Sequence, residues 1–172
     1  MQRTTTLKRF LVVCIPVIVI FPSFAQAQAV LSSADLAPLV GTWNGSLTYL
    51  DYSTGKPYTM AANLVVTQIG ATNTFLFSNQ YPNEPGANET DSVKLSEDGT
   101  VFDQEQIVRR TKQAANTLSF ITIGHGTDGN DNKPATFRHT YVLGKSVLKI
   151  MKDVTSPGDS SWVQRHAYSY TR

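Results

Sequence analysis

Cysteine is almost absent from this chain of 172 residues, and its single copy, Cys14, lies in an apolar stretch near the N-terminus. One cysteine cannot form an internal disulfide, and it offers only one thiolate to a metal ion. Small exported domains often depend on disulfides for stability. A domain formed by the rest of this chain must depend on a hydrophobic core instead, and its length is sufficient for one.

A strong excess of charge of one sign is also missing. The chain has 15 Lys and Arg residues against 13 Asp and Glu residues, a net charge of +2. Three of the basic residues, Arg3, Lys8 and Arg9, precede the apolar stretch, and without them 12 remain against 13 acidic residues. The remainder therefore has a net charge of about −1, which does not favour nucleic acid as a partner.

No apolar run reaches the roughly 20 residues that a membrane-spanning helix needs. The longest covers residues 10–24, contains two prolines and is followed by Ala25-Gln26-Ala27-Gln28-Ala29. A basic start, a short apolar run and alternating small residues are typical of a secretory signal peptide. We predict a signal peptide over residues 1–27 with cleavage after Ala27, or alternatively after Ala29. The mature protein would then have no permanent membrane anchor and would reside in a bacterial periplasm or outside the cell.

Familiar catalytic and cofactor motifs are absent as well. The chain has no Gly-x-Ser-x-Gly segment and no glycine-rich phosphate loop between a strand and a helix. Its histidines, His125, His139 and His166, lack the spacing of a metal site. We expect Asp103 and Glu105 on one solvent-facing strand. The sequence therefore predicts no catalytic residue, no cofactor and no metal.

Short strands separated by Gly, Pro, Asn and Asp residues make up the rest of the sequence. The pattern predicts strands over residues 41–52, 57–69, 74–79, 90–95, 101–109, 117–124, 135–143, 146–154 and 162–170. Residues 28–38 form a short lead-in, with a short helix as an option over residues 33–39, and residues 39–172 form one domain. Two long loops are expected over residues 81–90 and 124–134. We predict an all-β fold, an antiparallel up-and-down β-barrel of about eight to nine strands, because closure leaves no exposed edge.

The segment Gly41-Thr42-Trp43 begins the first predicted strand and resembles the glycine-x-tryptophan signature of the lipocalins and the wider calycin superfamily. The resemblance implies that Trp43 plugs the closed end of a barrel. It also implies that an arginine near the end of the last strand covers the tryptophan ring, and Arg165 and Arg172 are the two candidates. Gly41, Trp43 and these arginines would be structural residues.

Strand alternation suggests which side chains line the barrel. Trp162, Gln164, His166, Tyr168 and Tyr170 share one face of the last strand, and Phe137, His139 and Tyr141 share a face of an earlier one. Aromatic side chains with a few hydrogen-bonding groups suit a pocket for a small apolar or amphipathic molecule. The alternative is that these side chains simply fill the interior.

Three functions are consistent with this sequence, and we rank an exported small-ligand-binding protein first. A protein-interaction or inhibitor domain that acts through the two long loops ranks second. An unrecognised hydrolase or isomerase ranks third, and it would require His139 or His166 to lie in a cleft beside a carboxylate.

Overall fold

The computed structural model describes residues 29–51, 53–113, 116–129 and 131–172. The predicted signal peptide and its cleavage after Ala27 lie outside these ranges. Within them, no helix has both the length and the apolar character needed to cross a membrane.

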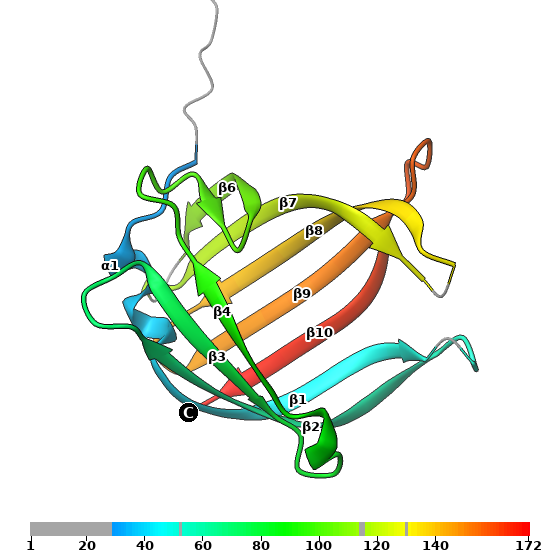
Figure 1. The fold of residues 1–172 in the computed structure, drawn as a ribbon, viewed down its shortest axis with the longest axis horizontal. Coiled ribbons are helices and arrows are strands. Elements are labelled where there is room, and N and C mark those ends of the chain that lie inside the picture. The colour runs from blue at the N-terminus through cyan, green and yellow to red at the C-terminus, as the bar shows by residue number, and fades with distance from the viewer. Residues whose placement is uncertain (1–28, 52, 114–115, 130) are drawn as a thin grey trace, which may run out of the picture.

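The described chain forms one short α-helix, two short 3₁₀ helices and ten strands. The strands make one antiparallel sheet in the order β4-β3-β2-β1-β10-β9-β8-β7-β6-β5. Figure 1 shows this sheet curling so that β3 and β4 face β8–β10. The elements are α1 (Ser33–Leu36), η1 (Ala37–Leu39), β1 (Gly41–Asp51), β2 (Lys56–Gln68), β3 (Thr74–Gln80), η2 (Pro85–Ala87), β4 (Glu89–Lys94), β5 (Val101–Phe102), β6 (Glu105–Lys112), β7 (Leu118–Asp128), β8 (Lys133–Leu143), β9 (Val147–Thr155) and β10 (Val163–Thr171).

In the described residues, the two edges of the sheet meet where the chain turns from β4 to β5. Leu95, just after β4, forms an isolated bridge with Phe102 in β5. The backbone N–H of Asp103 also donates to the carbonyl of Lys94 at 2.9 Å. The predicted all-β, up-and-down architecture is confirmed, as a nearly closed barrel.

The number of strands exceeds the prediction because a turn divides one expected strand. Asp103 and Gln104 adopt φ values of 51° and 65°. Two consecutive left-handed residues form a tight hairpin turn, so β5 and β6 pair with each other. The expectation that Asp103 and Glu105 lie on one strand is therefore wrong: Asp103 is in the turn and Glu105 begins β6.

The second predicted long loop is also wrong. Residues 124–128 continue β7, and β8 already begins at Lys133. Thr127 pairs with Pro134 and Asp128 with Lys133, so the two strands remain in register almost to their connection. The Gly and Asp residues of this segment suggested a loop, but pairing between long neighbouring strands overrides their low strand propensity.

The strand registers place the inward-facing side chains in layers that run across the barrel wall, because directly paired residues share a face of the sheet. The first layer is apolar, the second is aromatic and the third is polar. The apolar layer consists of Leu118, Leu143, Leu148 and Tyr170. The aromatic layer consists of Phe120, Tyr141, Ile150 and Tyr168. The polar layer consists of Thr122, His139, Lys152 and His166.

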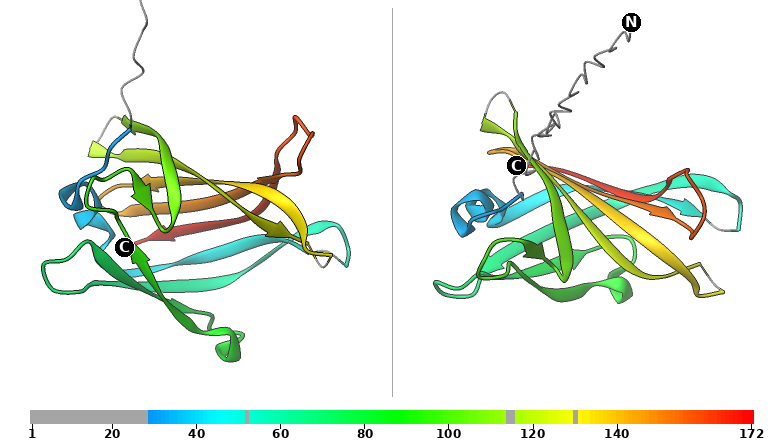
Figure 2. Two further views of the ribbon diagram at one scale, coloured as in Figure 1. Left: turned by 45° about the horizontal axis from the view of Figure 1, so that its top comes forward. Right: turned by 90° about the horizontal axis from the view of Figure 1, so that it is seen from above.

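The apolar layer lies toward the end of the barrel that α1 and η1 cover, whereas the β1–β2 and β7–β8 hairpins project at the other end (Figure 2). Leu36 and Leu39 are almost fully buried beside Trp43, which is 0% exposed. The Trp43 indole N–H donates to the carbonyl of Leu39 at 2.8 Å. We call this region, formed by Leu36, Leu39 and Trp43 with the apolar layer, the capped end.

Arg172 stacks on the indole of Trp43 with its guanidinium carbon 4.1 Å from the ring centroid. The same guanidinium donates to the backbone carbonyls of Pro38, Val40 and Lys145. It therefore ties the N-terminal helical segment to the last strand. Arg165, the other candidate, pairs with Asp128 instead.

Candidate ligand-binding site

A cavity of about 290 Å³ lies between the aromatic and polar layers of the wall and the opposite strands β3, β4 and β5. Its apolar lining comes from Phe77, Val93, Phe102 and Ile150. Its polar lining consists of Asn79, Glu89, Asp91, Asp103, His139, Tyr141, His166, Tyr168 and Tyr170. The volume is close to the lower end of the range of about 300–1,000 Å³ in which small-molecule sites fall.

One wall of the cavity contains a buried carboxylate–imidazole pair. His139 Nδ1 lies 2.7 Å from Glu105 Oε2, and the side chains are 18% and 13% exposed. Thr122, which is directly opposite His139 in the neighbouring strand, donates its hydroxyl to the same carboxylate oxygen at 2.5 Å. Burial raises the pKa of Glu105, but the hydrogen bonds from His139 and Thr122 outweigh it and hold the pKa below its usual value.

Space for this carboxylate depends on Gly124. A Cβ at that position would lie 2.5 Å from Glu105 Oε1 and 2.8 Å from its Cγ and Cδ. Any larger residue would therefore displace the Glu105 side chain. Because Glu105 is ionised at neutral pH and accepts from Nδ1, His139 holds a proton on Nδ1, and Nε2 is the ring nitrogen left for a ligand.

His166 lies across the polar layer from His139, with the two ring centroids 6.4 Å apart. Burial, with smaller contributions from Lys152 and His139, lowers the pKa of His166 to about 4. The imidazole is therefore neutral at pH 7. Lys152 is paired with both histidines in the sheet, and its Nζ lies 4.0 Å from the centroid of the Phe137 ring.

The tyrosine hydroxyls of the cavity fall into two groups. Tyr168 and Tyr81 share a hydrogen bond of 2.8 Å between their Oη atoms. Tyr141 and Tyr170 are only 7% and 2% exposed. Neither hydroxyl has a hydrogen-bond partner in the described residues. Burial raises the pKa of both tyrosines, so both remain neutral donors.

Four of the side chains predicted to bind a ligand line the cavity: His139, Tyr141, His166 and Tyr168. The other three do not. Trp162 lies before β10 and stacks on the guanidinium of Arg138. Arg138 alternates along β8 with His139, which faces the cavity, so Arg138 and Trp162 lie on the outer face of the sheet. Gln164 is exposed, and Phe137 packs beneath Lys152.

A β-bulge explains why the alternation failed for Trp162 and Gln164. The register of β10 against β9 shifts between Gln164 and His166. A bulge adds one residue to a strand and so interrupts the period of two. Alternation holds only on the C-terminal side of the bulge, for His166, Tyr168 and Tyr170.

Sequence reasoning missed the acidic part of the site. Glu105 was predicted to face solvent, and Asp91, Glu89 and Thr122 were not considered. The polar side chain of Thr122 between apolar neighbours in β7 was one available signal, since a buried hydroxyl requires a partner. The contact between Glu105 and Gly124 depends on the turn at Asp103, which the sequence pattern did not reveal.

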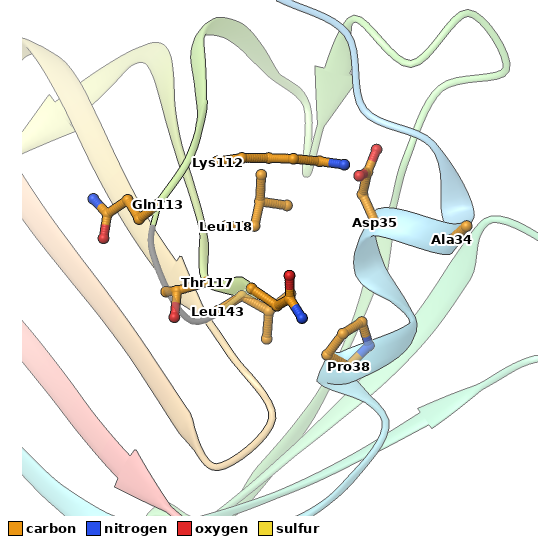
Figure 3. A pocket seen from close by; sticks show the side chains of 9 residues that line it. Ala34, Asp35, Pro38, Lys112, Gln113, Thr117, Leu118 and Leu143 are labelled. Carbon is orange, nitrogen blue, oxygen red and sulfur yellow. The ribbon is translucent and has the colours of Figure 1, made fainter.

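A second cavity, of about 200 Å³, lies between the N-terminal helices and the β6–β7 hairpin. Figure 3 shows Ala34, Asp35 and Pro38 on one side of it and Leu118 and Leu143 on the other, with the Lys112 side chain extending toward Asp35. Asp35 is already paired with Arg110 at 2.6 Å and caps α1 through Ser32. The polar groups of this second cavity thus hold the helix against the barrel, and the interior cavity is the stronger candidate for a ligand site.

In the described residues, no group of three or more His, Cys, Asp or Glu side chains could hold a metal ion. No protein-family model matches the chain, and no curated protein matches it. Among solved structures, the chain is similar to Rv2717c from M. tuberculosis, with a TM-score of 0.55 and 12% sequence identity. That match covers 84% of this chain and 99% of the other. At this level of identity the similarity concerns the fold alone.

Proposed function

We propose that this protein is an exported small-ligand-binding protein that holds an amphipathic molecule in the interior cavity. The cavity itself is the observation that carries the proposal: about 290 Å³ remains between the barrel wall and β3–β5. A barrel of this size can be filled completely by its own side chains. Here Leu36, Leu39 and Trp43 occupy the interior at the capped end. Space remains between the aromatic and polar layers and the opposite strands.

The lining matches an amphipathic molecule. Phe77, Phe102 and Ile150 offer an apolar surface, and aromatic rings stabilise apolar groups over large contact areas. Tyr141 and Tyr170 are only 7% and 2% exposed, and their hydroxyls have no partner among the described residues. Both hydroxyls are therefore free to bond to whatever occupies the cavity. A ligand with a polar group could hydrogen-bond to these tyrosines in place of water.

Native mass spectrometry of the protein, purified without denaturation from its own exported compartment, tests the proposal. We expect a reproducible extra mass that organic solvent releases. Cleavage after Ala27 or Ala29 would give a chain that starts at Gln28 or Val30. Recovery of the bare protein mass would contradict ligand binding and favour the protein-interaction alternative, and recovery of the uncleaved chain would contradict export.

Variants link the extra mass to the cavity. His166→Ala and Tyr141→Phe should reduce retention of the ligand, because both side chains line the cavity. Trp162→Ala is the matched control, since this ring stacks on Arg138 outside the cavity. Equal loss of ligand in Trp162→Ala would place the bound molecule elsewhere.

An acid–base enzyme is a second candidate, and one observation favours it. His139 lies in the cavity wall with its Nδ1 beside the Glu105 carboxylate, so Nε2 is the ring nitrogen available to accept a proton. A general base that is oriented by a carboxylate has this arrangement. A screen of 4-nitrophenyl esters and enolisable ketones with wild-type protein and His139→Gln separates the two functions. Turnover that disappears in His139→Gln would favour the enzyme, and turnover equal in both would exclude His139 as the base.

A further inference from the structure

The geometry points to an organic cation, an amphipathic amine, as the class of ligand that the interior cavity binds. This inference rests on the proposed function, since it specifies the ligand of the same cavity. Three carboxylates, Glu89, Asp91 and Asp103, line the cavity on the side of β4 and the β5–β6 turn, and no Lys or Arg side chain is part of the described lining.

Within the described ranges, none of these three carboxylates forms an ion pair. The ion pairs of the described residues involve Asp35, Asp128, Asp131, Asp153 and Glu105. Asp91 has only a weak contact, from the Asn79 amide at 3.5 Å. Burial raises the pKa of Asp103, repulsion by Glu105 and Asp91 adds to the increase, and attraction to His139 opposes it without reversing it. A cation placed between Asp91 and Asp103 would relieve this repulsion.

The buried tyrosines provide an independent indication that a ligand belongs there. The carboxylates remain partly open to solvent and could simply be hydrated. Tyr141 and Tyr170, however, are more than nine-tenths buried, line the same cavity and have hydroxyls without partners in the described chain. Phenolic oxygens accept hydrogen bonds from an ammonium group, and aromatic faces attract cations. The O–H groups then remain donors to water or to another polar group of the ligand. The tyrosines therefore indicate that a ligand binds here, and the carboxylates indicate its charge.

Lys152 is the positive charge that works against this inference. It lies between His139 and His166 in the polar layer. Its ammonium rests on the Phe137 ring, and the side chain lines a neighbouring depression with Asp128 and Arg165 rather than this cavity. We therefore expect Lys152 to weaken cation binding without preventing it.

Three probes with the same apolar body test the charge: 4-phenylbutylamine, 4-phenylbutanol and 4-phenylbutyrate. Calorimetric titration at pH 7 and low salt should give the tightest binding for the amine, by about tenfold over the alcohol. The butyrate should bind most weakly. Binding of the amine should weaken as salt is added, because the carboxylates are exposed.

Variants then connect the preference to these side chains. Asp91→Asn and Asp103→Asn should each weaken amine binding by about threefold and leave alcohol binding unchanged. Glu97→Gln is the matched control, because Glu97 is exposed and does not line the cavity. Lys152→Met should strengthen amine binding.

The possible results separate the two proposals. Equal or tighter binding of the alcohol or the butyrate would overturn the cation inference while supporting a ligand cavity. Unchanged amine binding in Asp91→Asn and Asp103→Asn would overturn it as well. If none of the three probes binds at millimolar concentration, the proposed function and this inference both fail.

Discussion

The capped end of the barrel differs from its polar half, which we define as the aromatic and polar layers with the cavity. Both are built on the same strands, but they differ in how completely their side chains are packed and hydrogen-bonded. At the capped end, Trp43, Leu36 and Leu39 are almost fully buried and the indole N–H has a partner. In the polar half, the Tyr141 hydroxyl has no partner in the described residues, and the Asp103 carboxylate is repelled by Glu105 and Asp91. Dense packing stabilises the fold, whereas polar groups that the protein leaves unpaired beside a cavity are candidates for contact with a ligand.

The comparison predicts that damage to the capped end has the largest effect on stability. Trp43→Ala removes a fully buried ring, its hydrogen bond to Leu39 and the stacking surface of Arg172. We expect a loss of about 3–5 kcal/mol in the free energy of unfolding, measured by urea denaturation. Trp162→Ala, at the partly exposed ring on Arg138, should cost much less. Equal losses would contradict the assignment of the core to the capped end.

The neutral imidazole of His166 should make stability depend on pH. Its pKa is about 4 in the folded protein, against 6.5 as the ordinary value. Below pH 6.5 the unfolded chain therefore binds more protons, so the free energy of unfolding decreases as the pH falls from 6.5 to 4. The contribution is about 3 kcal/mol over this window.

Urea denaturation of wild-type protein and His166→Gln at several pH values isolates this contribution, because the other titrating groups are common to both. Wild-type protein should lose more stability than the variant between pH 6.5 and 4. Parallel pH profiles would show that His166 is not buried as described.

Gly124→Ala should disrupt the Glu105–His139 pair, because its Cβ would occupy the space of the Glu105 side chain. Displacing the carboxylate leaves Thr122 and His139 without their acceptor, at a cost of about 1–3 kcal/mol. Gly86→Ala is the control, since a Cβ there meets no atom within 4 Å. The nitrogen chemical shifts of His139 should change in the first variant only. An unchanged His139 spectrum in Gly124→Ala would argue against the pair.

Tyr141→Phe should have the smallest effect on stability. The hydroxyl it removes has no partner in the described residues, so the free energy of unfolding should change by less than about 0.5 kcal/mol. Ligand retention should nevertheless fall. A loss of stability above about 1 kcal/mol would indicate that the hydroxyl is bonded within the protein.

Much of the architecture could be predicted because alternation and turn residues are local signals. The all-β barrel, the short helix at residues 33–39 and most strand positions followed from them. The tenth strand did not, because Asp103 and Gln104 form a two-residue turn without the glycine that usually marks one. Strand pairing at residues 124–128 was missed because the glycines there suggested a loop.

The candidate site was predictable only in part. Alternation placed His139, Tyr141, His166 and Tyr168 correctly along their strands, and all four line the cavity. It failed for Trp162 and Gln164 at the bulge, which depends on pairing with β9. The acidic residues come from β4, from the β5–β6 turn and from β6. Their approach to the wall depends on how the sheet curls, and no local pattern encodes that.

The most direct test of the account is a ¹H–¹⁵N NMR titration of the protein with 4-phenylbutylamine and 4-phenylbutanol. We predict shifts of the backbone signals of His139, Tyr141, His166 and Tyr168 with either probe, while the indole N–H signals of Trp43 and Trp162 stay in place. Those two signals report on the capped end and on the outer face. Shifts confined to the indole signals or to the surface turns, with the polar half unchanged, would contradict a ligand site inside the barrel.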